Sequence, residues 1–199
     1  MSATLPDTLT LHRFPTPIGE ALLVTDTEGR LRAFDWHGYE DRMHRLMRLH
    51  YGPRATLAHG RAPAAILNTL EAYFAGDINS INSIPCLTGG TAFQRSVWAA
   101  LREIPAGKTW SYGDMAIRIG SPKAVRAVGL ANGANPIGLV VPCHRVIGAD
   151  GSLTGYGGGI ERKRWLLQHE RVPNFAAANL TLDLICPMPS GMVSKSTTK

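Results

Sequence analysis

The first part of the chain alternates between apolar and polar residues and then changes to helical spacing. Three short runs, separated by turn residues, predict the strands of an antiparallel β-sheet: residues 9–14, 21–25 and 31–36. Residues 39–51 and 63–74 repeat their apolar side chains at helical intervals, which predicts two helices. Residues 76–90 are rich in Gly, Asn, Ser and Pro, so we place a domain boundary there. The pattern therefore predicts a small N-terminal domain over residues 1–88.

The second part of the chain, residues 89–172, is predicted to be mainly helical. Its first helix follows Thr91, a potential N-cap, and Ser111 begins a pattern that resembles a capping box. A last helix begins at about Glu161. Residues 173–199 lose this periodicity, so we expect them to form a flexible tail.

Two of the predicted helices are joined by Gly120-Ser121-Pro122, which predicts a turn followed by a helix from about Pro122. Lys123 and Arg126 share the outward face of this second helix, beside Ala127. The pair is typical of a helix-turn-helix, although helices joined by Gly-containing turns occur in many other proteins. We therefore expect an α+β fold: an N-terminal antiparallel sheet with helices, then a mainly helical C-terminal domain with a helix-turn-helix.

The composition is that of an ordinary globular protein, but the charge is unevenly placed. The 199 residues are 44% hydrophobic and 18% charged, and no apolar run is long enough to cross a membrane. Residues 89–172 contain eleven Lys and Arg against five Asp and Glu, whereas residues 1–88 contain eight against nine. This excess predicts an anionic partner for the second domain, with nucleic acid the leading candidate and a solvated basic surface the alternative. Three cysteines without tight spacing argue against a disulfide framework and favour a cytoplasmic protein.

The candidate chemistry lies in an apolar run, residues 140–147, that contains Cys143, His144 and Arg145 at its centre. A thiol in apolar surroundings is ordinarily inert, but a neighbouring base can turn it into a nucleophile. Glu170 lies on the apolar side of the last helix, where a carboxylate needs a partner unless the helix end frays into water. A carboxylate bound to one imidazole nitrogen makes the other nitrogen more basic, so His144 could take the thiol proton directly or through a water molecule. The other Cys and His residues lack zinc-type spacing, so we expect no metal ion and no cofactor.

Together these motifs resemble the O6-alkylguanine-DNA alkyltransferases, also called methylated-DNA–protein-cysteine methyltransferases, in their short bacterial form. The resemblance extends from about Phe93 to Glu170 and continues more loosely over residues 9–88. It depends on six short motifs: Ser111-Tyr112-Gly113, Arg126-Ala127-Val128-Gly129, Asn135-Pro136, Pro142-Cys143-His144-Arg145-Val146, Gly155-Tyr156 and residues 165–170.

The resemblance implies DNA repair by stoichiometric and irreversible transfer of an alkyl group from O6 of guanine to Cys143, with O4 of thymine left open as a second donor. His144, Glu170 and a water molecule would form the relay that supplies the thiolate. Asn135 would order the site, and Tyr112 would lie against the flipped nucleotide and help to protonate the departing guanine. One molecule would repair one lesion, because a thioether has no accessible step back to the thiol.

The resemblance also implies contacts to DNA and to the damaged base. The expected DNA contacts come from four residues of the helix pair: Ser111, Lys123, Arg126 and Ala127. Arg126 would fill the gap that the flipped base leaves in the duplex. The expected base contacts come from Val146, Tyr156 and Gly157, and Gly157 replaces a Ser of many relatives, so no hydroxyl group can contribute there. The expected partner is double-stranded DNA containing O6-alkylguanine, with no membrane; we expect a monomer and leave cooperative binding along DNA open.

Three other functions fit parts of the same pattern. A damage sensor would bind the alkylated base without repairing it, but such relatives lack the acceptor cysteine that Cys143 would provide. A helix-turn-helix regulator would form a dimer and read bases in the major groove. A cysteine hydrolase would turn over an acyl substrate and would have no affinity for DNA.

Overall fold

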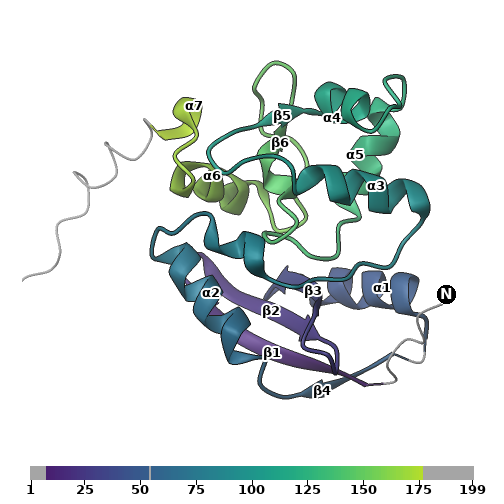
Figure 1. Ribbon diagram of the computed structural model, residues 1–199, viewed down its shortest axis with the longest axis vertical. Helices are drawn as coiled ribbons and strands as arrows, with labels where there is room; N and C mark the ends of the chain where they lie inside the picture. The colour runs from purple at the N-terminus through teal and green to yellow at the C-terminus, as the bar shows by residue number, and fades with distance from the viewer. Residues whose placement is uncertain (1–7, 54, 177–199) are drawn as a thin grey trace, which may run out of the picture.

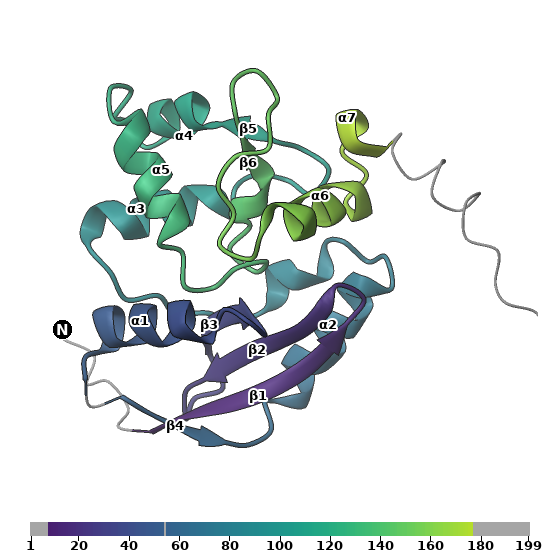
Figure 2. The ribbon, with the colours of Figure 1, turned by 180° about the vertical axis from the view of Figure 1, so that it is seen from behind.

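The N-terminal half of the protein is built on a four-stranded sheet (Figures 1 and 2). The computed structural model describes residues 8–53 and 55–176. The strands are β1 (Thr8–Thr16), β2 (Gly19–Thr25), β3 (Leu31–Trp36) and β4 (Thr56–His59). Their order is β3-β2-β1-β4, and β1, β2 and β3 are antiparallel, as the alternating pattern predicts. The short edge strand β4 was not predicted, and it lies parallel to β1.

Two helices, α1 (Glu40–Tyr51) and α2 (Ala64–Phe74), cover the two faces of this sheet. Both helices were predicted from the spacing of their apolar residues. Met43 and Met47 of α1 are buried with Leu22 and other side chains of one face, whereas Leu70 of α2 is buried with Leu23 and side chains of the other face. Because adjacent strand residues point to opposite sides, the sheet contributes to two separate clusters of buried side chains.

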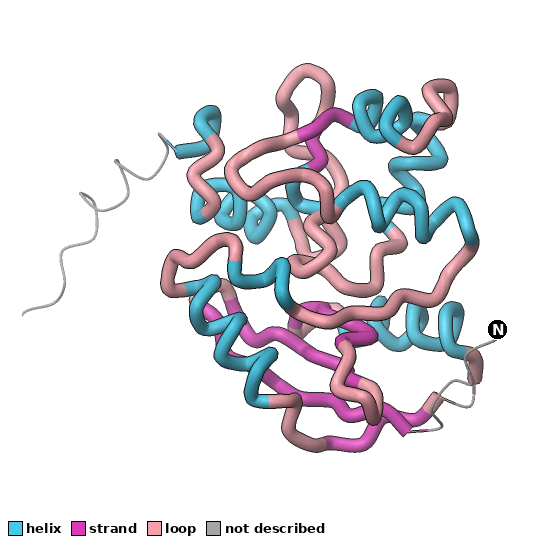
Figure 3. The backbone as a smooth tube through the Cα atoms, in the orientation of Figure 1, coloured by secondary structure: helices cyan, strands magenta, loops and turns pink. Residues whose placement is uncertain are grey.

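The C-terminal half is mainly helical, as predicted (Figure 3). Its helices are α3 (Ala92–Leu101), α4 (Tyr112–Arg118), α5 (Val125–Gly133), α6 (Ile160–His169) and α7 (Pro173–Ala176). Two 3-10 helices and two short parallel strands complete the described chain: η1 (Ser80–Ser83), η2 (Cys143–Arg145), β5 (Trp110–Ser111) and β6 (Val146–Ile147). Thr91 caps α3, as predicted, and does so in a capping box with Gln94, and Ser111 forms the predicted capping box with Asp114. None of the helices in the described part of the chain is long and apolar enough to span a membrane.

The second helix of the predicted pair begins later than expected. It starts at Val125 rather than at about Pro122, because Ser121–Ala124 form a turn closed by a hydrogen bond from Ala124 N to Ser121 O (2.8 Å). The fixed φ of proline suits the second position of such a turn as well as the first turn of a helix. Lys123 therefore lies in the turn before α5 and not on the helix.

Residues 173–176, which we assigned to the tail, form α7, and the remainder of the predicted tail lies outside the described residues. Phe175 of α7 packs on a small cluster that contains Leu167 and Val172. The C-terminal half thus continues in ordered form to residue 176.

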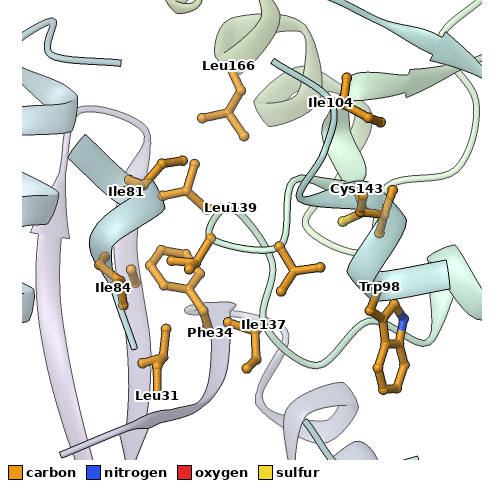
Figure 4. Packing of buried hydrophobic residues seen from close by; sticks show 14 of the residues in the cluster. Leu31, Phe34, Ile81, Ile84, Trp98, Ile104, Ile137, Leu139, Cys143 and Leu166 are labelled. Atoms are coloured by element: carbon orange, nitrogen blue, oxygen red, sulfur yellow. The ribbon is translucent and has the colours of Figure 1, made fainter. Parts of the chain in front are cut away.

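The two halves are joined through β3 at the edge of the sheet. Phe34 N donates to Pro136 O (2.9 Å), and Gly138 N donates to Phe34 O (3.1 Å). The largest cluster of buried side chains extends from the sheet to the C-terminal helices (Figure 4): it includes Leu31, Phe34, Ile81, Ile84, Trp98, Ile104, Ile137, Leu139, Cys143 and Leu166. The domain boundary near residue 88 stays a prediction, since this core is continuous across it.

Candidate active site

Asn135, which follows the end of α5, shapes the segment that leads to Cys143. Its Nδ2 donates to Val141 O (2.8 Å), and its Oδ1 accepts a hydrogen bond from Ile137 N (3.0 Å). The side chain is fully buried. These bonds close residues 135–141 into a compact loop, in which Leu139 adopts a φ of 69°, a conformation that few residues other than glycine adopt. Asn135 therefore determines the path of the chain between α5 and the candidate nucleophile.

Cys143 and His144 lie in the 3-10 helix η2, and both are buried. In an extended segment their side chains would point to opposite faces, but the 3-10 geometry removes that constraint. The Nδ1 atom of His144 is buried and has no hydrogen-bond partner among the residues that the structure describes. This nitrogen is therefore available to accept a proton.

Glu170 follows the last residue of α6 and holds the other side of the His144 ring. Its Oε1 interacts with His144 Nε2 at 2.9 Å and accepts hydrogen bonds from Tyr73 Oη (2.9 Å) and Arg145 Nη2 (2.8 Å). Its Oε2 accepts a hydrogen bond from Arg145 Nε (2.8 Å). All four side chains are buried. The helix end does not fray into water; it places the carboxylate in a buried network of four hydrogen bonds.

Burial sets the resting protonation of these groups. It raises the pKa of the Cys143 thiol, against a smaller opposing effect of Asn135. Burial also lowers the pKa of His144, although the carboxylate of Glu170 acts in the opposite direction. For Glu170, burial acts to raise the pKa, but His144 and Arg145 outweigh it and lower the pKa overall. The resting site therefore contains a neutral thiol, a neutral imidazole and an ionised carboxylate.

This arrangement can generate a thiolate in a site that does not stabilise one at rest. The proton of Cys143 can pass to Nδ1 of His144, and the resulting imidazolium lies against the ionised Glu170. Because the charges appear together and in a buried place, the thiolate is produced only as it reacts.

The Gly-rich segment 155–159 covers the thiol. Cys143 lines a cavity of only about 10 Å³ together with Tyr156, Gly157 and Arg42. The hydroxyl of Tyr156 is buried in the described structure without a hydrogen-bond partner, and burial raises the pKa of Tyr156. Tyr156 and Gly157, both expected to contact the substrate base, thus lie beside the thiol.

Arg42 reaches this cavity from α1 and connects the two halves of the protein. Its guanidinium pairs with Asp35 (2.5 Å) and donates to Gly133 O (3.1 Å) and Asn135 O (3.0 Å). A Cβ atom built on Gly157 would lie 2.4 Å from Arg42 Cζ. Glycine at position 157 therefore leaves the space that the Arg42 side chain occupies.

Lys163 of α6 ties the residue before the Gly-rich segment to the strand that follows the thiol. Its Nζ donates to Val146 O (2.5 Å) and to Thr154 O (2.6 Å), and the side chain is fully buried. Burial lowers the pKa of Lys163 to about 8, with a smaller opposing effect of Cys143. Val146, an expected base contact, is thereby held in place next to Cys143.

The predicted DNA-contacting residues lie away from this buried network, on α4, α5 and the turn between them. Lys123, Arg126 and Ala127 are exposed, and Ser111 is half-buried as the N-cap of α4. Tyr112 lies between the two groups, because its hydroxyl donates to Thr154 O (3.3 Å), immediately before the segment that covers the thiol. The structure thus brings Cys143, His144, Asn135, Glu170, Val146, Tyr156 and Gly157 together and leaves the basic residues on a separate surface.

Four residues of the site had no role predicted for them from the sequence: Tyr73, Arg42, Arg145 and Lys163. Lys163 precedes Glu170 by two helical turns, so both residues lie on the apolar side of α6. A charged residue in that position could have been recognised from the sequence as a member of the site. Arg145 is adjacent to His144 and was equally visible. Tyr73 and Arg42 come from the N-terminal half, and no local pattern marks them.

Comparison with known proteins identifies the class to which this fold and site belong. The family model for the 6-O-methylguanine DNA methyltransferase DNA-binding domain matches residues 92–172. The methylated-DNA–protein-cysteine methyltransferase of Salmonella typhimurium strain LT2 is 50% identical over 160 residues, which cover 80% of this chain and 94% of that protein. The enzyme of the same name from Shigella flexneri is 47% identical with the same coverage. The chain therefore belongs to the methylated-DNA–protein-cysteine methyltransferase family.

Solved structures agree with this assignment. The O6-methylguanine methyltransferase of Mycobacterium tuberculosis is 42% identical, with a TM-score of 0.66 over 88% of this chain and 99% of that one. The M. tuberculosis OGT in complex with DNA gives a TM-score of 0.67 with the same identity and coverage. The archaeal enzyme from Pyrococcus kodakaraensis is 25% identical, with a TM-score of 0.59 over 81% of this chain and 98% of that one.

Proposed function

We propose that the protein repairs alkylated DNA by transferring the alkyl group from O6 of guanine to Cys143 Sγ, once per molecule. The observation that carries this proposal is that Cys143, His144 and Glu170 are buried together: His144 Nε2 lies 2.9 Å from Glu170 Oε1, and Nδ1 has no hydrogen-bond partner within the described part of the chain. Family membership supports the same reaction. A damage sensor has no use for this relay, because it needs no thiolate.

The reaction is a displacement at the alkyl carbon. Removal of the Cys143 proton by His144 Nδ1, directly or through water, gives the thiolate, and Glu170 stabilises the imidazolium. The S–C bond forms as the C–O6 bond breaks, and the electron pair stays on the guanine, which takes up a proton with the help of Tyr112. The product thioether has no acidic proton and no leaving step, so the protein is consumed.

DNA binding is assigned to α4, α5 and the turn between them, acting as a helix-turn-helix. Arg126 and Ala127 are exposed on α5, and Lys123 is exposed in the turn. The cavity beside Cys143 is far too small for a purine, so the flipped guanine requires the Gly-rich segment 155–159 to move. Arg126 then fills the gap in the duplex. The odd number of cysteines fits action in the cytoplasm.

Measurement of the DNA product tests this proposal. A duplex containing a single O6-methylguanine is mixed with protein in excess and in deficit, and guanine and O6-methylguanine are quantified after digestion to nucleosides. We expect one guanine restored per protein molecule, with no further conversion on longer incubation, and none with Cys143→Ala. Cys86→Ala serves as the matched control and keeps full conversion. Tight binding without conversion would favour the damage sensor, and a sequence-specific footprint without conversion would favour the regulator.

A further inference from the structure

Tyr73 is a residue of α2 that reaches the candidate active site from the N-terminal half. Its hydroxyl donates to Glu170 Oε1 at 2.9 Å, although the two residues are 97 positions apart. The side chain is 0% exposed. Its ring packs edge-on against His169 with centroids 5.0 Å apart, and His169 Nε2 lies 2.7 Å from Tyr73 O. The next residue, Phe74, also contacts α6, with ring centroids 6.1 Å from Trp165 and 6.3 Å from His169, so the end of α2 meets α6 through its last two side chains.

The Glu170 carboxylate accepts hydrogen bonds from four donor groups, which are shared unevenly between its two oxygens. The four donors are His144 Nε2, Tyr73 Oη, Arg145 Nη2 and Arg145 Nε, and only Arg145 Nε binds Oε2. Three of these donors converge on Oε1, the oxygen that holds His144. Loss of the Tyr73 hydroxyl would leave that buried oxygen with two donors, His144 Nε2 and Arg145 Nη2, and would remove one of the hydrogen bonds that stabilise the ionised group.

We propose that Tyr73 is a positioning residue for alkyl transfer, which holds Glu170 Oε1 in the orientation that His144 requires and limits the basicity of that oxygen. The inference rests on the proposed function and gives the N-terminal half a direct part in it. Tyr73 acts through Glu170 and His144 and not on the reacting atoms. Because Oε1 is shared with Tyr73 and Arg145, the proton stays on His144 Nε2, and Nδ1 stays free for the proton of Cys143.

Removal of the Tyr73 hydroxyl should change the pH dependence of alkyl transfer. Hydrogen-bond donors favour the ionised form of a carboxylate, so loss of one raises the pKa of Glu170. A more basic Glu170 holds the imidazolium form of His144 more strongly, and the pKa of the coupled pair rises. The other charged or titratable groups around the pair are present in both the wild type and the variant, so the comparison isolates the Tyr73 hydroxyl. They are Arg145 and Cys143 on η2, Lys163 and His169 on α6, and Tyr156 on the Gly-rich segment. The rate should therefore need a higher pH to reach its plateau.

Single-turnover transfer from a duplex containing O6-methylguanine, measured across pH, tests the proposal. Tyr73→Phe should lower the plateau rate about tenfold and displace the rise of rate with pH upward by about one unit, the effect of one hydrogen bond to a charged group. Tyr51→Phe is the matched control, because Tyr51 is another buried tyrosine of the N-terminal half, and its hydroxyl donates to Arg32 O (3.0 Å) and Leu87 O (3.2 Å). Its pH profile should be that of the wild type.

Replacement of Tyr73 by 3-fluorotyrosine gives a second test that keeps the ring in place. Its phenol is a stronger donor, so the profile should move to lower pH, in the direction opposite to that of Tyr73→Phe. A Tyr73→Phe protein with the wild-type profile, or with a lower rate and an unmoved profile, would overturn the proposal. An unmoved profile in the fluorotyrosine protein would also overturn it, even where Tyr73→Phe does not fold. Failure of the wild-type protein to transfer the methyl group would instead contradict the proposed function.

Discussion

Lys163 shows how a single buried charge can make stability depend on pH. Its Nζ is enclosed between Val146 O and Thr154 O, and burial lowers its pKa to about 8, below the ordinary value of 10.5. Between these two values the unfolded chain binds more protons at this residue than the folded chain does, so the contribution of Lys163 to stability rises with pH. The cost of burying the ammonium is complete below about pH 8 and disappears as the pH approaches the ordinary value.

Lys163→Met should remove this dependence. We compare the free energies of unfolding of wild type and variant by urea denaturation. Between roughly pH 7 and pH 10.5, the value for the wild type should rise by about 2–3 kcal/mol more than the value for the variant. Lys108→Met, at an exposed position, provides the control and should follow the wild type at every pH. A difference between wild type and Lys163→Met that does not change with pH would contradict the account.

Gly157 and Arg42 form a pair in which one residue leaves the space that the other fills. A Cβ atom at position 157 would lie 2.4 Å from the Arg42 guanidinium carbon. Gly157→Ser should therefore lower the free energy of unfolding by about 1–3 kcal/mol, the cost of overfilling a packed site. The same substitution in an Arg42→Ala background should cost less, which a double-mutant cycle measures.

Gly129→Ser is a suitable control for this cycle, since a Cβ atom there would approach only Tyr112, at 3.9 Å. Its cost should be the same with and without Arg42. Equal costs of Gly157→Ser in the two backgrounds would mean that Arg42 does not restrict position 157.

At the scale of residues, the residues that perform the chemistry are easier to predict from the sequence than the residues that position them. Cys143 and His144 interrupt an apolar run, and Glu170 is a carboxylate on the apolar side of a helix, so each is locally conspicuous. Tyr73 and Arg42 look like ordinary residues of their helices. Their contacts connect residues about 90 or more positions apart, and no local pattern carries that information.

At the scale of elements, α5 was correctly predicted to be a helix, but the prediction of its first residue was wrong. Pro122 can begin a helix or occupy a turn, and the hydrogen bond from Ala124 N to Ser121 O shows that it occupies a turn. Lys123 consequently lies exposed at the entrance to α5. A lysine in this place can contact a phosphate group without reading a base.

Lys123→Ala should weaken binding to alkylated and to undamaged duplexes by similar factors. The slope of log binding constant against log salt concentration should fall in magnitude by about 0.9, the value for one phosphate contact. Arg48→Ala, an exposed change on α1 of the N-terminal half, should leave the slope unaltered. Fluorescence anisotropy at several salt concentrations measures both, and equal slopes for Lys123→Ala and the wild type would remove Lys123 from the DNA-binding surface.

At the scale of the whole molecule, the candidate nucleophile belongs to the main core. Cys143 is 4% exposed and is buried with side chains of both halves (Figure 4). The sequence predicts the two halves and most of their elements, since each depends on local periodicity. It does not predict that β3 hydrogen-bonds to residues 136–138, because that pairing joins segments about a hundred positions apart.

Alkylation of Cys143 should destabilise the protein as a whole. An added alkyl group has little space in a cavity of about 10 Å³, and overfilling a core costs about 1–3 kcal/mol. For a protein of this size we expect the methylated form to melt about 5 °C lower than the free form. Calorimetry before and after complete reaction measures this, with Cys143→Ala treated identically as the control, and equal melting temperatures would contradict the expectation.

The central claim is that Cys143 itself receives the alkyl group. Intact-protein mass spectrometry after mixing with a duplex containing O6-methylguanine should show a single increase of about 14 Da, as the thiol becomes a methyl thioether. The increase should saturate at one per chain, map to the peptide that contains Cys143 and be absent from Cys143→Ala. An unchanged mass, or a methyl group on Cys86 or Cys186, would contradict the account.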